Sequence, residues 1–285
     1  MHRPRAYGFA LYQWAELAST RCNRWLAMRC ASDRYLLVGG YPKSGTTWIS
    51  SMIGAAMHRP VPRMKATPVL QRSVLHHHWE FDPRIARSVY VVRDGRDVMV
   101  SEYVAMMRAA RQLIERRERL AGLTSIERAW LLDRGRNARL EQRFRNVFGA
   151  AFAPDDSAKN FPRFVRASLE HPFSEVTRQS WHQHVRGWDP SPEPLRVRYE
   201  AMLENPSDTL GELLDRLGAK IDPTQLSDVV DRFSFERVTG RRRGSEDRES
   251  FFRKGTPGDW RNWFDAELEQ EFHRRTDDLA LRLAD

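Results

Sequence analysis

Cysteine is scarce in this sequence, with two residues in 285, Cys22 and Cys30. Neither belongs to a C-x-x-C pair, so the spacing supports neither a disulfide framework nor a zinc site. If both lie on one helix, two turns separate them, which is too far for a disulfide bond. We therefore expect no bound metal, and we expect a reducing compartment such as the cytoplasm.

Long hydrophobic runs are also missing. No stretch of about 18 apolar residues occurs, so we expect no transmembrane helix. An apolar-rich stretch follows Arg3 and Arg5, but Gln13 and Glu16 interrupt it. This pattern favours a surface amphipathic helix over a signal peptide. We assign residues 1–34 to an N-terminal helical segment whose basic and apolar residues suit peripheral contact with a membrane.

Acidic residues are the minority charge. The chain has 47 Lys and Arg against 38 Asp and Glu, which gives a net charge of +9. Such a surface favours anionic ligands, whether a nucleotide, a nucleic acid or an acidic membrane. The basic residues are mostly arginines spread along the chain. We therefore interpret them as the source of a diffuse positive potential over the surface, and we expect no nucleic-acid partner. With 41% hydrophobic residues, the chain is long enough for one large α/β domain or two small ones.

The apolar pattern alternates between strand-like and helix-like segments. Short strands are predicted at 35–40, 88–93 and 195–200, and helices at 46–57, from 94 onward, and after Asp265. This alternation is typical of a three-layer α/β fold, with a parallel, P-loop-like sheet flanked by helices. We assign 35–285 to one domain. Residues 104–180 contain charged helical runs without a clear strand, and we expect them to form a helical insertion over the active site that binds the acceptor.

The first strand runs directly into the stretch YPKSGTTW, residues 41–48. A strand, a Gly-containing turn and a helix that starts near Thr46 form an anion site, because loop amides and the helix N-terminus face the ligand. Gly40 and Gly45 have the spacing of an ATP-binding loop, G-x-x-x-x-G-K-[ST], but Thr46 stands where that loop has its lysine. The lysine here is Lys43, which would approach a phosphate chain from another side.

A second candidate anion site is VVRDGRDVMVSEY, residues 91–103. Arg93 ends a predicted strand, and Ser101 lies about two turns into the following helix. Both would reach the carboxyl edge of the sheet, where ligands bind in α/β folds. The alternative is that Arg93 and Arg96 pair with Asp94 and Asp97 on the surface.

The third segment is FFRKGTPGDWRNWF, residues 251–264. Arg253 and Lys254 place two cations beside Gly255, a residue that lets the backbone approach a ligand closely. The alternative is a basic loop that is held to the core by aromatic anchors, in particular Trp260 and Trp263.

Taken together, YPKSGTTW, R-D-G-R-D-V-x-x-S and R-K-G-x-x-G-D-W resemble the PAPS-dependent sulfotransferases of the cytosolic type. The resemblance extends in order over roughly 35–270, includes WHQHVRGW and RYEAMLENP, and is poor over 104–175. It implies that PAPS is the cofactor and PAP the product. The positions that match the family's 5′-phosphosulfate site are Lys43, Ser44, Gly45, Thr46 and Thr47. Those that match its 3′-phosphate site are Arg93, Ser101, Arg253, Lys254 and Gly255, and those that match its adenine site are Trp48, Tyr199 and Phe235.

The resemblance also implies the reaction, an in-line transfer of a sulfuryl group from PAPS to an acceptor hydroxyl or amine. Positioning and charge stabilisation carry most of such a reaction, and Lys43 suits the leaving phosphate oxygen. In this family a histidine closes a short strand as the general base, usually after a lysine and a hydroxyl residue. In SVLHHHWE, residues 73–80, His78 takes that place, with His76 in place of the lysine and His77 in place of the hydroxyl residue.

Some alternatives stay open at this point. His76 or His77 could be the base in place of His78, whereas a metal site of all three is geometrically poor, since neighbours on a strand point to opposite faces. For the whole protein, the alternatives are a P-loop kinase that uses ATP and Mg²⁺ and a non-catalytic protein that binds PAP or polyanions. The acceptor class is open among small molecules, lipids and glycans, and the many arginines favour a negatively charged one. The oligomeric state is left open.

Overall fold

The fold is described from a computed structural model of the chain. The structure describes residues 18–29, 34–62, 68–85, 88–119, 136–149, 151–173, 176–189 and 195–282. Most of the predicted N-terminal segment, residues 1–17 and 30–33, therefore lies outside the described residues. Among the described residues, no helix is both long and apolar enough to cross a membrane.

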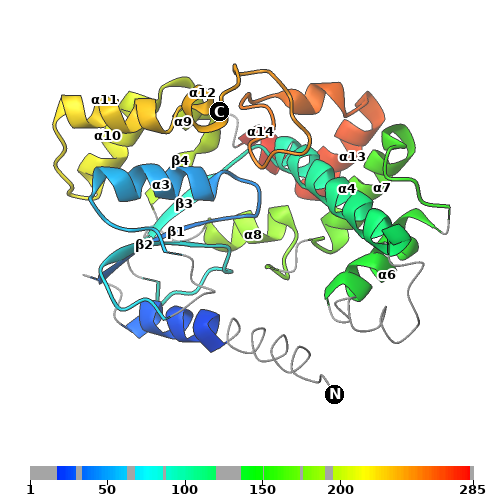
Figure 1. Cartoon of the computed structure of the whole chain (residues 1–285), viewed down its shortest axis with the longest axis horizontal. Helices are drawn as coiled ribbons and strands as arrows, with labels where there is room; N and C mark the ends of the chain where they lie inside the picture. Colours follow the sequence, from blue (N-terminus) through cyan, green and yellow to red (C-terminus); the bar gives the residue numbers. More distant parts are fainter. Residues whose placement is uncertain are drawn as a thin grey trace.

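Four parallel strands form the centre of the molecule (Figure 1). They are β1 (Tyr35–Gly40), β2 (Ser73–His77), β3 (Ser88–Val92) and β4 (Leu195–Arg198), in the order β2-β1-β3-β4. In this register Gly39 lies opposite His77, and Gly40 lies opposite Val91. All carboxyl ends therefore meet at one edge, as predicted for a parallel sheet.

Helices cover both faces of the sheet, which confirms the predicted three-layer architecture. On one face, Leu36 and Val38 of β1 pack in a cluster with residues of α3 (Thr46–Ala56), α10 (Pro206–Arg216) and α11 (Pro223–Arg232). On the other, Leu37 packs with Trp188 of α8 (Trp181–Trp188) and Ala27 of the helix that spans 18–29. β1 is apolar along its whole length because both faces are buried, and each buried side chain contributes about 1.5–3 kcal/mol.

A helical layer continues the molecule beyond β3 (Figure 1). It consists of α4 (Gly95–Arg119), α6 (Arg136–Phe148), α7 (Ser157–Glu170) and α13 (Ala266–Thr276). An aromatic cluster joins these helices, with Tyr103, Phe144, Phe161 and Phe272 among its buried members. The parts of 104–180 that the structure describes contain helices and no strand, in agreement with the sequence pattern. That this layer binds the acceptor stays a prediction.

The remaining helices of the described ranges are short. They are α9 (Tyr199–Glu204), α12 (Phe235–Thr239), the 3₁₀ helix η1 (Asp259–Asn262) and α14 (Leu279–Arg282).

Two predicted elements end earlier than expected. The strand expected at 195–200 ends at Arg198, and Tyr199 already begins α9. Asp265 caps the last long helix as predicted, since its carboxylate accepts a hydrogen bond from the Leu268 amide at 2.8 Å. The helix does not continue to residue 283, however, because Asp277 and Asp278 both have positive φ, at 49° and 55°, and separate α13 from α14. Aspartate is among the residues that tolerate this conformation best, so the pair ends the helix.

Candidate active site

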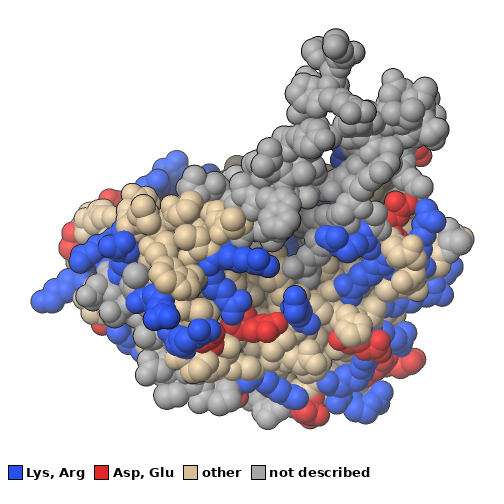
Figure 2. Space-filling view, turned by 90° about the horizontal axis from the view of Figure 1, so that it is seen from below, with Lys and Arg blue, Asp and Glu red and all other residues tan. Residues whose placement is uncertain are grey.

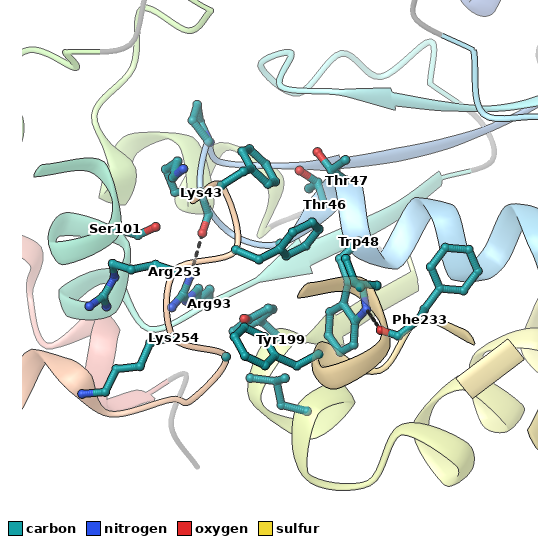
Figure 3. A pocket seen from close by; sticks show the side chains of 18 of the residues that line it. Lys43, Thr46, Thr47, Trp48, Arg93, Ser101, Tyr199, Phe233, Arg253 and Lys254 are labelled. Carbon is teal, nitrogen blue, oxygen red and sulfur yellow. Dashed lines mark hydrogen bonds between the residues drawn. The ribbon is translucent and has the colours of Figure 1, made fainter. Parts of the chain in front are cut away.

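A cavity of about 340 Å³ opens at the carboxyl edge of the sheet. Figure 3 shows its side chains converging from the loop after β1, from α4, from α9 and from the segment 251–255. Of the residues predicted from the sequence, the lining includes Lys43, Gly45, Thr46, Thr47, Trp48, His78, Arg93, Ser101, Tyr199, Phe235, Arg253, Lys254 and Gly255. The three predicted segments, which lie far apart in the sequence, thus meet at one site together with His78, Tyr199 and Phe235.

The loop after β1 has the geometry of an anion cradle. Gly45 has φ 87° and is the residue before α3. No side chain caps the helix at this position, and the first turn of α3 contains no acidic residue. The first amides of α3 are thus available to an anion, and the helix dipole favours negative charge there. Ser44 lies inside the loop, 1% exposed and absent from the cavity lining, and its amide donates to the Tyr41 carbonyl at 3.1 Å.

Gly45 is required for a second reason. A Cβ atom at this position would lie 2.4 Å from the Tyr199 ring, closer than side chains tolerate. Because Gly45 has no side chain, the loop after β1 (the phosphate loop, residues 41–45) and the first turn of α9 can approach each other. Tyr199 was predicted from its match to an adenine-site position, and here it also forms a wall of the anion cradle.

Lys43 supplies a cation in partly desolvated surroundings. Burial, together with the positive charges of Arg108 and Arg93, lowers its pKa to about 8. Its Nζ atom lies 4.8 Å from the centroid of the Phe251 ring, on the segment that closes over the cavity. At neutral pH the ammonium is still mostly charged, and a bound anion would stabilise that form.

Arg93 is a buried cation with spare hydrogen-bonding capacity. It donates from Nη1 to the Lys43 carbonyl at 2.8 Å, and its guanidinium lies 4.4 Å from the centroid of the Tyr199 ring. Its Nε is buried and has no hydrogen-bond partner within the described part of the chain. Since a buried donor without a partner costs about 1–3 kcal/mol, this atom indicates a place for an anionic ligand.

The alternative of surface ion pairs with Asp94 and Asp97 is wrong for Arg93. For Arg96 it is right only for the pairing with Asp94, because the Arg96 side chain is buried. Arg96 pairs with Asp94 at 2.8 Å and with Glu269 at 2.7 Å, whereas no carboxylate pairs with Arg93 in the ranges that the structure describes. Asp97 has a different role, because its carboxylate accepts from the amides of Gly258 at 2.7 Å and Trp260 at 2.9 Å.

The segment that contains Arg253 and Lys254 is held to α4 through that carboxylate and through Trp260, whose ring lies 3.6 Å from the Arg96 guanidinium carbon. An aromatic anchor thus holds this segment to the core, as the alternative predicted. The same segment also lines the cavity. Gly255 has φ 68°, and a Cβ there would lie 2.4 Å from the Phe235 ring.

Sequence reasoning missed Asp259, which balances the two cations of this segment. Its carboxylate lies 2.6 Å from Arg253 Nη2 and also pairs with Lys254. Burial raises the pKa of Asp259, but hydrogen bonds from Lys254 and Asn262 and the charge of Arg253 outweigh that effect and lower the pKa to about 2. The acid at the start of η1, within the G-D-W motif, is the signal that would have found it.

Aromatic side chains line the end of the cavity away from Lys43. The indole of Trp48 donates to the Phe233 carbonyl at 2.8 Å and meets the Tyr199 ring edge-on at 5.8 Å (Figure 3). Phe235, 7% exposed, forms part of the same wall. Phe233 contributes its backbone carbonyl to this arrangement.

The three consecutive histidines divide between two faces, as expected for a strand. His76 and His78 line the cavity, with ring centroids 4.7 Å apart. His77 points to the other face, where its ring stacks on Trp79 at 4.5 Å and burial lowers its pKa well below the usual value. Among the described residues no group of three or more side chains is placed to hold a metal ion.

Each of the two cavity histidines has one hydrogen-bond contact that bears on where its proton lies. His78 Nδ1 lies 2.7 Å from the Gly40 carbonyl oxygen. A carbonyl can only accept, so Nδ1 carries the proton, and Nε2 is the basic nitrogen of the neutral ring. His76 Nε2 lies 3.1 Å from Thr46 Oγ1. Burial lowers the pKa of His76 to about 3, and the neighbouring His78 adds to the shift.

Known proteins resemble this chain in sequence and in fold. The family model for the sulfotransferase domain matches residues 77–282. Human sulfotransferase 1C2 is 23% identical, and the match covers 83% of this chain and 80% of the relative. Sulfotransferase 1A1 of Canis lupus familiaris is 26% identical over the same shares.

Solved structures with the same fold include mouse sulfotransferase SULT7A1 complexed with PAP. It has a TM-score of 0.59 and 18% identity, over 90% of this chain and 91% of that one. Retinol dehydratase in complex with androsterone and inactive cofactor PAP gives a TM-score of 0.55 and 17% identity, over 93% and 84% of the two chains. The family match spans well over half of the residues, so the chain belongs to the sulfotransferase domain family and is a PAPS-dependent sulfotransferase.

Proposed function

We propose that this protein transfers the sulfuryl group of PAPS to a hydroxyl or amine of a small-molecule, lipid or glycan acceptor, with His78 as the general base. One observation carries the proposal. The basic nitrogen of His78 is defined by the contact of Nδ1 with Gly40, and the same cavity contains the desolvated cation Lys43 and the buried donor Arg93 Nε.

The donor's two anionic groups match two cationic regions of the cavity. The 5′-phosphosulfate lies against Lys43, Thr46, Thr47 and the first amides of α3. The 3′-phosphate is held by Arg93, Ser101, Arg253 and Lys254, and its adenine by the aromatic wall. The partnerless Nε of Arg93 and the first amides of α3, which no side chain caps at Gly45, both support this fit. Each charge-assisted contact contributes about 1.5–3 kcal/mol.

In the transfer step, His78 Nε2 takes the proton of the acceptor hydroxyl as that oxygen forms a bond to sulfur. The bond between sulfur and the 5′-phosphate oxygen breaks, and the leaving oxygen becomes negatively charged. Lys43 stabilises that charge through its ammonium, which the low-dielectric cavity makes more effective. Neither a metal ion nor a covalent enzyme intermediate is needed to balance this step.

The acceptor is expected on the His78 side of the cavity. The cavity that contains His78 is also lined by Val176, Phe251 and Phe252, which offer apolar contact. An acceptor with an apolar body and one reactive hydroxyl or amine fits these surroundings better than a highly hydrated one.

Transfer of radiolabelled sulfate from PAPS to a panel of phenols, alcohols, amines and glycans tests the proposal. We expect labelled product with at least one acceptor from the wild-type protein, and a rate lower by about 10²-fold or more from His78→Ala. The kinase alternative predicts transfer from ATP in the presence of Mg²⁺, and a non-catalytic protein would bind PAP without any product. Either result with purified wild-type protein would overturn the proposal.

The helix at 18–29 supports a second proposal, peripheral contact with an anionic membrane. Ser19, Asn23 and Ala27 face the protein, and Asn23 accepts from the Val69 amide at 2.6 Å. On the opposite side Trp25 is 58% exposed. Arg21 and Arg29 lie four residues on either side of it, hence on the same face, and form no ion pair with any residue that the structure describes.

Residues 18–29 include no acidic side chain, and Leu70, 67% exposed, lies next to the helix in the segment that Asn23 anchors. Seen from below in Figure 2, basic side chains surround uncharged ones at the left of this face. Exposed tryptophan flanked by arginine suits the interface of an anionic bilayer.

Sedimentation with phosphatidylcholine vesicles, with and without phosphatidylserine, tests this contact. We expect binding that requires phosphatidylserine, is weakened by salt and is lost in the Arg21→Glu/Arg29→Glu variant. The matched control is Arg216→Glu/Arg232→Glu, at the ends of α10 and α11 on the other side of the sheet. Equal binding by both double variants would contradict the proposal.

A further inference from the structure

Thr46 is held in one orientation from two sides. It is the first residue of α3 and is 2% exposed. Its methyl group lies over Gly40 of β1, where an added Cβ would come within 2.7 Å of Thr46 Cγ2. With the methyl in that position, the hydroxyl lies 3.1 Å from Nε2 of His76, on β2. The Thr46 side chain is thus fixed by the backbone of one strand and by a side chain of the next.

The direction of that hydrogen bond decides what Thr46 can bind. A hydroxyl has one proton, and it can point either at His76 or at a ligand. If His76 Nε2 donates its proton to Oγ1, the Thr46 proton is available to an anion in the cavity. If His76 accepts instead, the hydroxyl presents a lone pair to the anion, which repels it. An anion therefore selects the form of His76 with the proton on Nε2.

His76 is suited to stay in this neutral form. Its surroundings are desolvated, and the rings of His76 and His78 meet edge-on at 4.7 Å, so a charge on His76 would oppose the charge that His78 acquires as a base. With a pKa of about 3, His76 does not compete with His78 for the acceptor's proton at neutral pH.

We propose that His76 is a positioning residue for the transferred sulfonate: it donates from Nε2 to Thr46 Oγ1 and thereby directs the Thr46 hydroxyl proton to a sulfonate oxygen. The inference rests on the proposed function for the identity of the anion. The Thr46 hydroxyl lies beside the two cavity histidines, on the side of the proposed base, which is where the transferred group lies. PAP lacks that group, so the effect of His76 is specific to PAPS.

Calorimetric titration with PAPS and with PAP, in the absence of an acceptor, tests the inference. Since a hydrogen bond to a charged group contributes on the order of 10- to 100-fold in affinity, we expect His76→Leu to weaken PAPS binding by about that factor. The same variant is expected to leave PAP binding unchanged. Thr46→Val is expected to have the same effect, and the double variant to be no worse than either single one. His76→Gln, whose amide Nε2 can donate in a similar place, should restore most of the affinity.

Thr47→Val is the matched control, because Thr47 lines the same cavity and has no contact with His76 among the described interactions. Its effect is expected to add to that of His76→Leu. Additive losses for His76→Leu and Thr46→Val would overturn the inference, since His76 would then act independently of Thr46. Equal losses of PAP and PAPS affinity would also overturn it and leave His76 with a structural role.

The test separates this inference from the proposed function. The binding experiment needs no acceptor, so a wild-type protein that discriminates PAPS from PAP through His76 but transfers no sulfate would support the inference and contradict the function. Two results together would make His76 the base and overturn the inference. The His76→Gln variant would lose the acid limb of the pH–rate profile, and the His78→Ala variant would keep full activity.

Discussion

The imidazole Nδ1 of His78 lies 2.7 Å from the carbonyl oxygen of Gly40, the last residue of β1. Two adjacent parallel strands thus fix both the orientation of the ring and its tautomer. A backbone carbonyl holds the ring without adding a charge and leaves Nε2 as the nitrogen that can take a proton.

Replacement of His78 separates chemistry from donor binding. We expect His78→Ala to lower kcat by about 10²- to 10⁴-fold, the usual contribution of a general base. PAP affinity should change little, since no charge that faces the phosphates is removed. Steady-state kinetics with a good acceptor and calorimetry with PAP measure the two quantities. Activity close to wild type in this variant would assign the base to another residue.

Replacement of Lys43 should affect turnover more than product binding. Its ammonium stabilises the charge that develops on the leaving oxygen, so we expect Lys43→Ala to lower kcat by about 10²- to 10³-fold. PAP affinity should fall by a much smaller factor, because Arg93, Arg253 and the amides of α3 remain. If kcat and PAP affinity fall by equal factors, Lys43 contributes to binding alone.

The lowered pKa of Lys43 predicts a pH dependence of donor binding. Below pH 8 the ammonium of the unliganded protein is mostly charged, and above it the amine is mostly neutral. The affinity for PAP should therefore fall as pH rises through about 8, and stay high below it. Calorimetry at pH 7 and pH 9 measures the change. Lys43→Arg, which keeps its charge over this range, should remove the dependence, and a persistent fall in that variant would point to another group.

Gly45 and Gly149 offer a matched pair for the phosphate loop, since both have φ 87°. A Cβ at Gly45 would lie 2.4 Å from the Tyr199 ring, whereas nothing lies within 4 Å of a Cβ at Gly149. Both alanine variants incur the backbone strain of about 1–2 kcal/mol. Only Gly45→Ala adds the clash, about 1–3 kcal/mol more, and only it should lose PAP binding. Equal changes in melting temperature for both variants would contradict this geometry.

The sequence predicted the centre of the fold and the cavity lining more readily than the contacts that assemble them. Continuous apolar runs identified β1 and β3, because strands buried on both faces need apolar residues at every position. The short helices α9 to α12 were not predicted, and Tyr199 was placed in a strand. The residues after Tyr199, Glu200 to Leu203, are good helix formers, so the composition already favoured the helix that begins there.

Long-range contacts explain most of what the sequence could not predict about the site. Asp97 holds the amides of Gly258 and Trp260, more than 160 positions away, and no local pattern links them. The ion pairs of Asp259 with Arg253 and Lys254 were also missed, although they are local, because two adjacent cations were read as ligands for phosphate alone. The alternation of His76, His77 and His78 was predicted, since the period of a strand determines it.

Thermal unfolding of the purified protein with PAP, compared with ATP plus Mg²⁺, tests the central claim most directly. A ligand present at about 100 times its dissociation constant adds roughly 2.7 kcal/mol to the stability of the native state. We expect PAP to raise the melting temperature of the wild-type protein, to do so less in Arg93→Ala, and ATP with Mg²⁺ to have little effect. Stabilisation by ATP with Mg²⁺ and none by PAP would contradict the assignment of this cavity to PAPS.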